Sequence, residues 1–255
     1  RGLNPASNFA LNFFDPINNL LPRYGAEKIF IEGDAVILSI FENQGEPEKW
    51  YGVARACGLS VQMLMAVKRY NRRNVKNGLP RLDLGIGISF STGAPTFFYD
   101  NESRIMISHS INEADRLSKC DRVLRRRIKN SRGPFRVYQY RIDTSGFSMP
   151  ELPLNTPVLR YNVMGIELAP DAFAKLCREI HVKKIKGPIP ALGIKNFTGY
   201  TGKFPTLYGS YQRVVIREAN VPEISLSDFQ VTGSTGKKYY EVCTHPVLYE
   251  HAKNL

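Results

Sequence analysis

The spacing of apolar residues divides the first half of the chain into helices and strands. Over residues 46–74 the apolar positions return every three or four residues, which predicts a helix with a break at Gly58. The same period predicts a helix over residues 8–21, interrupted or started near Pro16, and a helix over residues 110–127. The helical period therefore accounts for most of the first half outside its strands.

Between these helices the apolar residues alternate or cluster as they do in strands. Residues 27–41 predict two strands joined tightly at Gly33-Asp34, and residues 82–90 predict a buried strand. Residues 97–108 predict a further hairpin with its turn at 100–102. The resulting order of helix, strand, strand, helix, strand, strand and helix predicts an α/β chain of the α+β sandwich type, with antiparallel hairpins in place of a repeating Rossmann unit.

After residue 127 the pattern changes to strands, one short helix and a loop rich in glycine, lysine and proline. The strands fall at 135–142, 158–168, near 211–218 and near 238–244, the helix at 171–180 and the loop at 183–206. A proline-rich connector predicts a boundary near residue 145. The pattern leaves open whether the second part is a separate domain or extends the first sheet.

Composition and charge narrow the class of protein. The chain is 43% hydrophobic and 11% aromatic, which is enough to form a globular core. Its net charge of +12 is compatible with nucleic acid, an anionic membrane or nucleotide phosphates as partners. No apolar run reaches the roughly 18 residues of a membrane span. Because the chain starts at Arg1 and has no signal-like segment, we interpret it as a fragment.

The cysteines and histidines give no metal signature. The cysteines are far apart and form no C-x-x-C motif, which favours free thiols in a reducing compartment and hence a cytoplasmic location. The histidines have no metal-ligand spacing. These residues are Cys57, Cys120, Cys177 and Cys243, and His109, His181, His245 and His251.

Asp34 is the first candidate for binding chemistry. It follows Gly33 at a predicted hairpin turn, and an isolated Gly-Asp pair is in most cases simply a good turn. Here the flanking strands are strongly apolar, so they would hold the carboxylate rigidly at a strand end. Mg²⁺ prefers one or two carboxylates together with substrate phosphates, so Asp34 would need a partner carboxylate.

Asn112 and Arg116 form the second candidate. They are four residues apart in the predicted helix 110–127 and therefore lie on one face of it. The planar guanidinium group of an arginine suits a phosphate group. The simpler interpretation is a helix in which Asn112 caps the end and Arg116 pairs with Glu113 or with an anion from solvent.

Basic residues gather at 122–129, which could indicate nucleic acid binding. Few aromatic residues are interleaved with these cations, and the run continues the predicted helix. We therefore interpret it as the charged end of that helix and do not expect nucleic acid as a partner.

Taken in this order, the Gly33-Asp34 hairpin, the strand 82–90 and the helix with Asn112 and Arg116 resemble the catalytic domain of class III nucleotide cyclases. The resemblance covers about half of the chain. It implies conversion of a nucleoside triphosphate to a 3′,5′-cyclic nucleoside monophosphate and pyrophosphate.

The resemblance also implies an architecture. A ferredoxin-like, palm-type cyclase core would occupy residues 1–145 and would lack its first strand, which we expect before Arg1. Residues 146–255 would form an accessory α+β extension of unknown role.

Site roles follow from the same resemblance. Asp34 would bind Mg²⁺ or Mn²⁺ together with an aspartate on the first strand, Asn112 would orient the ribose and Arg116 would contact the phosphates. In this family two protomers pair head to tail, one supplying the carboxylates and the other the Asn and Arg, so a homodimer is expected.

The base-selecting positions depart from the family pattern. Purine cyclases usually have polar residues where this chain has Phe30 and Ile105, so the base is open and a pyrimidine is included. The lysine that the family uses on the triphosphate could be Lys129, Lys186 or Lys237.

Three classes of function are compatible with these residues. The first is an active cyclase with two divalent metals at a dimer interface. The second is a degenerate cyclase-like domain that binds a nucleotide or a partner without turnover. The third is a nucleic-acid-associated module, which only the charge favours.

Overall fold

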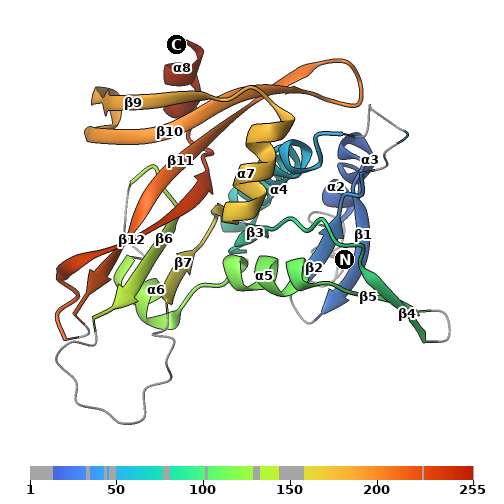
Figure 1. The fold of residues 1–255 in the computed structure, drawn as a ribbon, viewed down its shortest axis with the longest axis horizontal. Coiled ribbons are helices and arrows are strands. Elements are labelled where there is room, and N and C mark those ends of the chain that lie inside the picture. Colours follow the sequence, from blue (N-terminus) through green and yellow to red (C-terminus); the bar gives the residue numbers. More distant parts are fainter. Residues whose placement is uncertain are drawn as a thin grey trace.

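A curled, mainly antiparallel sheet with helices on both faces makes up most of the molecule, so the predicted α+β class is confirmed (Figure 1). The computed structural model describes residues 14–32, 35–42, 45, 50–76, 81–100, 103–128, 133–143, 158–225 and 227–254. The helices are α2 (Asp15–Asn18), α3 (Leu21–Tyr24), α4 (Gly52–Lys76), α5 (His109–Ser118), α6 (Arg122–Ile128), α7 (Pro170–Glu179), the 3₁₀ helix η3 (Pro190–Leu192) and α8 (Pro246–Lys253). The strands are β1 (Glu27–Glu32), β2 (Ala35–Ser39), β3 (Ile86–Ile88), β4 (Thr96–Asp100), β5 (Ser103–Ile107), β6 (Val137–Ile142), β7 (Val158–Asn162), β8 (Ile166–Leu168), β9 (Lys183–Ile189), β10 (Ile194–Pro205), β11 (Tyr211–Ile224) and β12 (Val231–Val242).

The main sheet has the strand order β3-β8-β12-β11-β10-β9. Strands β3 and β8 run parallel, and the neighbours from β8 to β9 run antiparallel. Strand β6 pairs in parallel with the end of β11 and antiparallel with β7, so β6 and β7 form a ribbon at the side of the sheet. The hairpins β1-β2 and β4-β5 are separate two-stranded sheets.

The sheet takes strands from both sides of residue 145. Strand β3 pairs with β8 in the register Ile86 to Ile166, and β6 pairs with both β7 and β11. The second half of the chain extends the sheet to which the first half contributes β3 and β6.

Helices α4 and α7 cover one face of the main sheet. Ile166 and Leu168 of β8 point into the apolar core that these helices form, together with Leu64 of α4 and Leu176 of α7. Burying aliphatic side chains of this size stabilises the fold by about 1.5–3 kcal/mol each. Because side chains alternate along a strand, Glu167 between the two core residues points to the other face.

On the other face the sheet is covered by α8, by the β6-β7 ribbon and, over β3, by α5. Helix α8 packs over Ile185, Phe197 and Val215 through Leu248. The β6-β7 ribbon covers the part nearer to β12 and β8, where Gln139 of β6 contacts Glu167. The two faces of the sheet thus differ, one apolar and the other partly charged.

Gly58 does not break the long helix, which runs without interruption through α4. A Cβ atom at this position would lie 2.8 Å from the ring of Phe204 and 2.9 Å from the ring of Tyr24. The missing side chain lets α4 approach both rings closely. The predicted break was wrong because the glycine serves packing against residues that are distant in sequence.

Two other predicted elements are split. The helix predicted at 110–127 consists of α5 and α6, separated where Lys119 takes an extended conformation and Asp121 hydrogen bonds to Arg160. The strand predicted at 158–168 consists of β7 and β8, with Met164 at φ 56 between them. Within the described part of the helix predicted at 8–21, the chain forms α2 and α3.

The segment 183–206 is not the loop that its composition predicts. It forms β9, η3 and β10, and β10 pairs with β9 on one side and with β11 on the other. Lysines and glycines obscure the alternation, yet Ile185, Ile189 and Phe197 are buried against the α8 side. The strand predicted near 211–218 lies within β11, and the one predicted near 238–244 overlaps β12, which ends at Val242.

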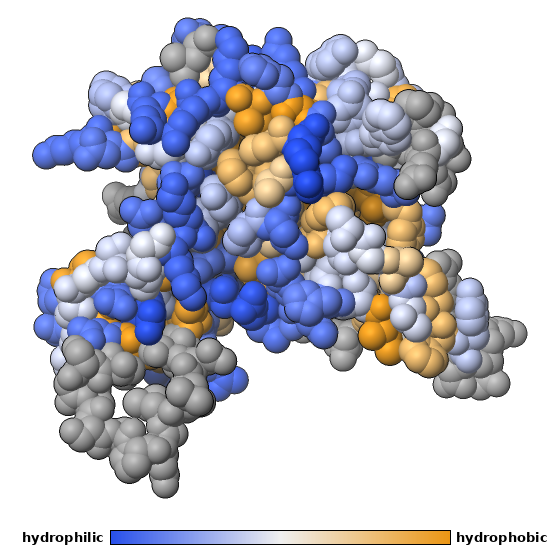
Figure 2. All heavy atoms as spheres, viewed as in Figure 1, coloured by the Kyte–Doolittle hydropathy of each residue, from blue (hydrophilic) through white to orange (hydrophobic). Residues whose placement is uncertain are grey.

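Hydrophilic side chains cover most of the face seen in Figure 2, and apolar ones gather at the side where the β4-β5 hairpin lies. Phe98 of β4 and Ile107 of β5 expose 55% and 56% of their surface there. Among the described helices, none combines the length and the apolarity that crossing a bilayer requires.

Candidate functional site

Helix α5 carries the predicted pair Asn112 and Arg116, and its start is set by local residues. Ser108 is the N-cap, in extended conformation, and its hydroxyl accepts a hydrogen bond of 3.3 Å from the backbone N–H of Ser110. The helix ends at Ser118, whose hydroxyl donates to the carbonyl of Asp115 at 2.8 Å. The helix predicted around Asn112 and Arg116 is therefore present, with Ser108 rather than Asn112 as its cap.

Two glycines let α5 lie directly on the backbone of β3. A Cβ atom at Gly87 would be 2.0 Å from the carbonyl oxygen of Ala114, and one at Gly85 would be 2.2 Å from that of Ser118. No side chain fits at such distances, so only glycine allows the contact. The motif Gly-x-Gly at this strand thus fixes the height of α5 above the sheet.

Asn162 at the end of β7 holds the same helix laterally. Its side-chain N–H₂ group donates to the carbonyl of Leu117 in α5 at 2.8 Å and to that of Ile86 in β3 at 3.0 Å. The Asn162 side chain is buried, so both bonds are made away from water. Helix, β3 and β7 are joined at one point, and α5 is therefore a rigid support for its exposed side chains.

Asn112 and Arg116 are both exposed on the outer side of α5. The Arg116 side chain is 59% exposed, and its Nη2 lies 3.6 Å from Oε1 of Glu113. Glu113 is in turn held by the hydroxyl of Ser89, which donates to its Oε2 at 2.6 Å. The pairing with Glu113 that the simpler sequence interpretation offers is thus formed, and it leaves most of the Arg116 guanidinium accessible.

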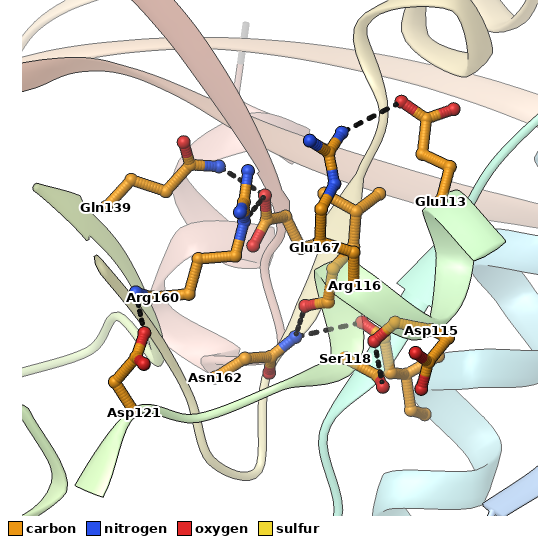
Figure 3. Close-up of polar contacts among 11 residues, drawn as sticks. Glu113, Asp115, Arg116, Ser118, Asp121, Gln139, Arg160, Asn162 and Glu167 are labelled. Carbon is orange, nitrogen blue, oxygen red and sulfur yellow. Dashed lines mark hydrogen bonds and ion pairs between the residues drawn. The ribbon is translucent and has the colours of Figure 1, made fainter. Parts of the chain in front are cut away.

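Behind Arg116 lies a buried carboxylate, Glu167 of β8 (Figure 3). Its Oε1 accepts a hydrogen bond from the side-chain amide of Gln139 and lies 3.7 Å from Nε of Arg160. Burial raises the pKa of Glu167 to about 7, although Arg160, Gln139 and Arg116 oppose the shift. Burial likewise lowers the pKa of Arg160, and the charge of Arg116 contributes to that shift.

Arg160 is also fixed through its backbone. Its N–H donates to Oδ2 of Asp121 at 2.6 Å, and the N–H of Asp121 donates back to the Arg160 carbonyl at 2.7 Å. Figure 3 shows Arg116 between Glu113 on one side and Glu167 and Arg160 on the other. Two guanidinium groups, one exposed and one buried, therefore lie in the same charged cluster, a pattern suited to binding phosphate oxygens.

A cleft of about 1930 Å³ lies on the other side of α5. Strands β2 and β3, the start of α4, the loop 89–95 and the inner side of α5 line it. From α5 it is lined by Ser110, Ile111, Ala114 and Ser118, among others, but by neither Asn112 nor Arg116. The cleft and the Asn-Arg pair thus occupy different sides of one helix.

The other residues predicted for the site are not gathered around α5 in the described part of the chain. Phe30 is half-buried in β1 opposite Ile37, and Lys186 is exposed on β9, at the opposite edge of the sheet from β3. Asp34 and Lys129 lie outside the described residues. Ile105 pairs with Phe98 in the backbone of β5, and its side chain lies outside the described part. Lys237 is exposed on β12.

The described residues contain no group of three or more His, Cys, Asp or Glu side chains that could hold a metal ion. The described part of the chain therefore supplies no complete centre for the expected Mg²⁺ or Mn²⁺. Asp34, the predicted metal ligand, is not among these residues.

Sequence reasoning missed the cluster members that come from strands: Gln139, Arg160, Asn162 and Glu167. One signal could have found Glu167, since it is the single charged residue in the otherwise apolar run Gly165-Ile166-Glu167-Leu168. The carboxylate in such a strand is either exposed or needs partners from another element. Here the partners come from β6 and β7.

Comparisons with known proteins identify no family for the chain and find a distant structural neighbour. No family model matches the chain, and no curated protein matches it. Among solved structures, the crystal structure of the guanylyl cyclase Cya2 matches with a TM-score of 0.42 and 12% sequence identity, over 90% of this chain and 87% of that chain. A likeness this distant carries no argument about activity.

Proposed function

We propose that the chain is a nucleotide cyclase domain that forms a 3′,5′-cyclic nucleoside monophosphate and pyrophosphate from a nucleoside triphosphate. The observation that carries the proposal is the exposed pair Asn112 and Arg116 on a helix seated on glycine backbone. This is the motif for which the sequence resembles class III cyclases, and it is held rigidly where a substrate could reach it.

The chemistry suits these side chains. The ribose 3′ hydroxyl gives up its proton to water and its oxygen bonds to the α-phosphorus. The bond from the α-phosphorus to the oxygen that bridges the α- and β-phosphates breaks, and pyrophosphate leaves. Negative charge on the phosphate oxygens is stabilised by positioned donors, and the planar guanidinium of Arg116 can supply two of them. The amide of Asn112 can hydrogen bond to the ribose and hold the attacking oxygen in line.

We propose that the site is shared between two copies of the chain. Strand β2, which begins directly after Asp34, lines the cleft, whereas Asn112 and Arg116 point away from the cleft. One substrate would therefore meet the hairpin of one protomer and the α5 helix of its partner. This arrangement supports a head-to-tail homodimer.

The proposed reaction uses Mg²⁺ or Mn²⁺, which supply charge to the phosphates when bound. Asp34 is the carboxylate that we propose for this role, and a second carboxylate must come from elsewhere. Among the described residues β2 pairs with β1 alone and β3 with β8 alone, and both line the cleft.

For the base we propose weak discrimination or a preference for a pyrimidine. Phe30 offers stacking and shape without a hydrogen bond, and Ile105 occupies the second selecting position. Apolar contacts discriminate by roughly 10–200-fold, whereas hydrogen bonds to a base can reject others by several powers of ten. Lys129 and Lys186 stay candidates for contacting the triphosphate of a substrate shared by two protomers.

The test is to incubate the protein with Mn²⁺ and ATP, GTP, CTP or UTP and to identify the products by mass. We expect a cyclic nucleotide and pyrophosphate, lost in Arg116→Ala and retained in Arg122→Ala, which removes an exposed arginine of α6. Product formation that survives Arg116→Ala would contradict the proposal. Nucleotide binding without any product would favour the degenerate domain, which the apolar residue at Phe30 supports.

A further inference from the structure

The face of the main sheet on which α8 packs carries a group of cations near the β10-β11 turn. Lys203 of β10 lies directly opposite Arg213 of β11. Lys203 alternates with Phe204, which is buried in the core on the other face of the sheet. Lys183 begins β9 and points to the α8 side, as does Ile185 two residues later. Three neighbouring strands thus bring three cations to one face.

No carboxylate on these strands balances the three charges. Residues 181–217 contain neither Asp nor Glu, and in the part of the chain that the structure describes the side chains of Lys183 and Lys203 form no ion pair. Arg213 is held on the sheet, because its Nη1 donates to Oγ1 of Thr201 and to the carbonyl of Ala252, each at 3.1 Å. Like charges directly opposite each other destabilise a pair of strands, so the Lys203-Arg213 pair has a cost that no described counter-ion offsets.

Protection of a sheet edge is the simpler interpretation of such lysines. Lysine on an edge strand prevents pairing with other chains, and this accounts for Lys183 on β9. It does not account for Lys203 and Arg213, because β10 and β11 are interior strands with a partner on each side. Glutamate protects an edge as well as lysine does, so a group of cations alone indicates an anionic partner.

Two exposed tyrosines lie next to these cations. Tyr211 begins β11 two residues before Arg213 and therefore points to the same face. It is 71% exposed, and Tyr208 in the preceding turn is 72% exposed. Rings with this exposure can stack on unpaired bases while neighbouring cations bind the phosphates between those bases. The basic run at 122–129, by contrast, has few aromatic residues among its cations.

An anionic membrane would also attract lysine and tyrosine side chains. Helix α8, however, stands on the same face of the sheet and packs over Ile185 and Val215 through Leu248 (Figure 1). A flat bilayer is kept from the sheet by this helix, whereas a single strand of nucleic acid can follow the β-strands beside it. The position of the cations therefore favours nucleic acid.

We propose that this surface binds single-stranded nucleic acid, with the cations on phosphates and the tyrosines stacked on bases. We name it the β9-β11 patch, and its members are Lys183, Lys203, Tyr208, Tyr211 and Arg213. The patch is separate from the proposed active site, because β9 and β3 are the opposite ends of the sheet and α5 packs on β3. Binding at the patch does not depend on cyclisation, so either proposal can fail without the other.

The test measures the fluorescence anisotropy of a labelled oligo(dT) of about 12 nucleotides, mixed with the whole chain at several salt concentrations. Three phosphate contacts predict that the logarithm of the binding constant falls against that of the salt concentration with a slope of about −2. Lys203→Gln should make this slope shallower by about 0.7.

The tyrosines should have a different signature. Tyr211→Ala should weaken binding by about 5–150-fold and leave the salt slope unchanged, because it removes stacking and no charge. Tyr211→Phe keeps the ring and should bind like the wild type. If Tyr211→Ala does not fold, Tyr208→Ala tests the same contribution in the turn.

Exposed residues elsewhere provide matched controls. Arg122→Gln removes one charge from α6, and Tyr99→Ala removes a tyrosine of β4 that is 74% exposed. Both variants should bind oligo(dT) like the wild type. Equal losses in Lys203→Gln and Arg122→Gln would overturn the proposal, because binding would then follow net charge and not the patch.

Three further outcomes would overturn the proposal. The first is equal affinity for the duplex of the same length, whose paired bases cannot stack on the tyrosines. The second is the absence of oligo(dT) binding at about 50 mM salt, which would leave edge protection as the role of Lys183. The third is binding to phosphatidylserine vesicles that Lys203→Gln abolishes, without binding of oligo(dT), since the patch would then be a membrane site.

Discussion

At the scale of single residues, Gly87 determines how closely α5 approaches β3. We expect Gly87→Ala to force the helix away from the strand, because the new Cβ would lie 2.0 Å from the Ala114 carbonyl oxygen. Overpacking of this kind costs about 1–3 kcal/mol of the free energy of unfolding. Chemical denaturation of the variant measures this cost.

Gly93→Ala is the control for that substitution. Its nearest neighbour would be the Ser91 hydroxyl at 3.6 Å, an ordinary contact, and its backbone needs no positive φ. We expect an effect within about 0.5 kcal/mol, as for surface substitutions in general. Equal losses of unfolding free energy in Gly87→Ala and Gly93→Ala would show that Gly87 does not set the distance between α5 and β3.

Glu167 and Glu241 make stability depend on pH. Burial raises the pKa of each to about 7, above the roughly 4.3 of a glutamate in an unfolded chain. Between these values the folded protein holds protons that the unfolded chain has released. Unfolding therefore releases protons, and the free energy of unfolding should fall as the pH rises from about 4.5 to about 7.

Denaturation at a series of pH values tests this sign. Glu241→Gln and Glu167→Gln should each remove up to one of the protons released on unfolding and so flatten the curve. Because a neutral amide replaces a titrating carboxyl group, the free energy of unfolding of each variant should fall less than that of the wild type between about pH 4.5 and about pH 7. A wild-type stability that rises from pH 5 to pH 7 would contradict the expected protonation of these buried groups.

At the scale of elements, Asn162 joins α5, β3 and β7. We expect Asn162→Ala to cost about 1–3 kcal/mol, since it leaves two backbone carbonyls without their donor. The loss should be local, and hydrogen exchange in α5 should become faster while exchange in β10 and β11 stays slow. Uniformly faster exchange would mean that Asn162 stabilises the whole fold, and not specifically the packing of α5 on β3.

The elements that the sequence predicted well are those with local signals. The β1-β2 hairpin follows from two apolar runs joined by a Gly-Asp pair, and the start of α5 follows from the helical period of its apolar residues. Strands β9 and β10 were missed because Lys, Gly and Pro obscure an alternation that becomes visible once Ile185 and Phe197 are seen to face α8. The break between α5 and α6 depends on Arg160, which is distant in sequence.

The residues of the candidate site likewise differ in whether the local sequence predicts them. Asn112 and Arg116 are recognisable from their spacing in one helix. Their surroundings are not, because Glu167, Gln139 and Arg160 come from three strands that meet only in the folded sheet. These residues were not predicted because they are far from α5 along the chain, and not because their residue types are unusual.

At the scale of the whole molecule, the proposed shared site predicts complementation between two inactive variants. Asp34→Asn removes the proposed metal ligand of one protomer, and Arg116→Ala removes the phosphate contact of its partner. Mixed dimers should contain one intact site, so part of the activity should return on mixing. Recovery should require subunit exchange, which differently tagged chains can demonstrate.

The matched mixture combines Arg116→Ala with Asn112→Ala. Both changes lie on α5, so one site in a mixed dimer lacks the arginine and the other lacks the asparagine, and no recovery is expected. Activity that returns in this mixture as well would argue against a site shared between hairpin and helix. No recovery in either mixture, despite proven exchange, would argue for a site within one chain.

The pairing of β3 with β8 has a consequence for synthesis of the chain. Strand β3 is made early, but its partner β8 leaves the ribosome only after both α5 and the β6-β7 ribbon. Until then Gly85 and Gly87 are not part of a sheet, and α5 has no fixed surface on which to pack. The helix that bears Asn112 and Arg116 should therefore be among the last parts to become ordered during translation, and a nascent chain ending near residue 145 should leave it open to proteases.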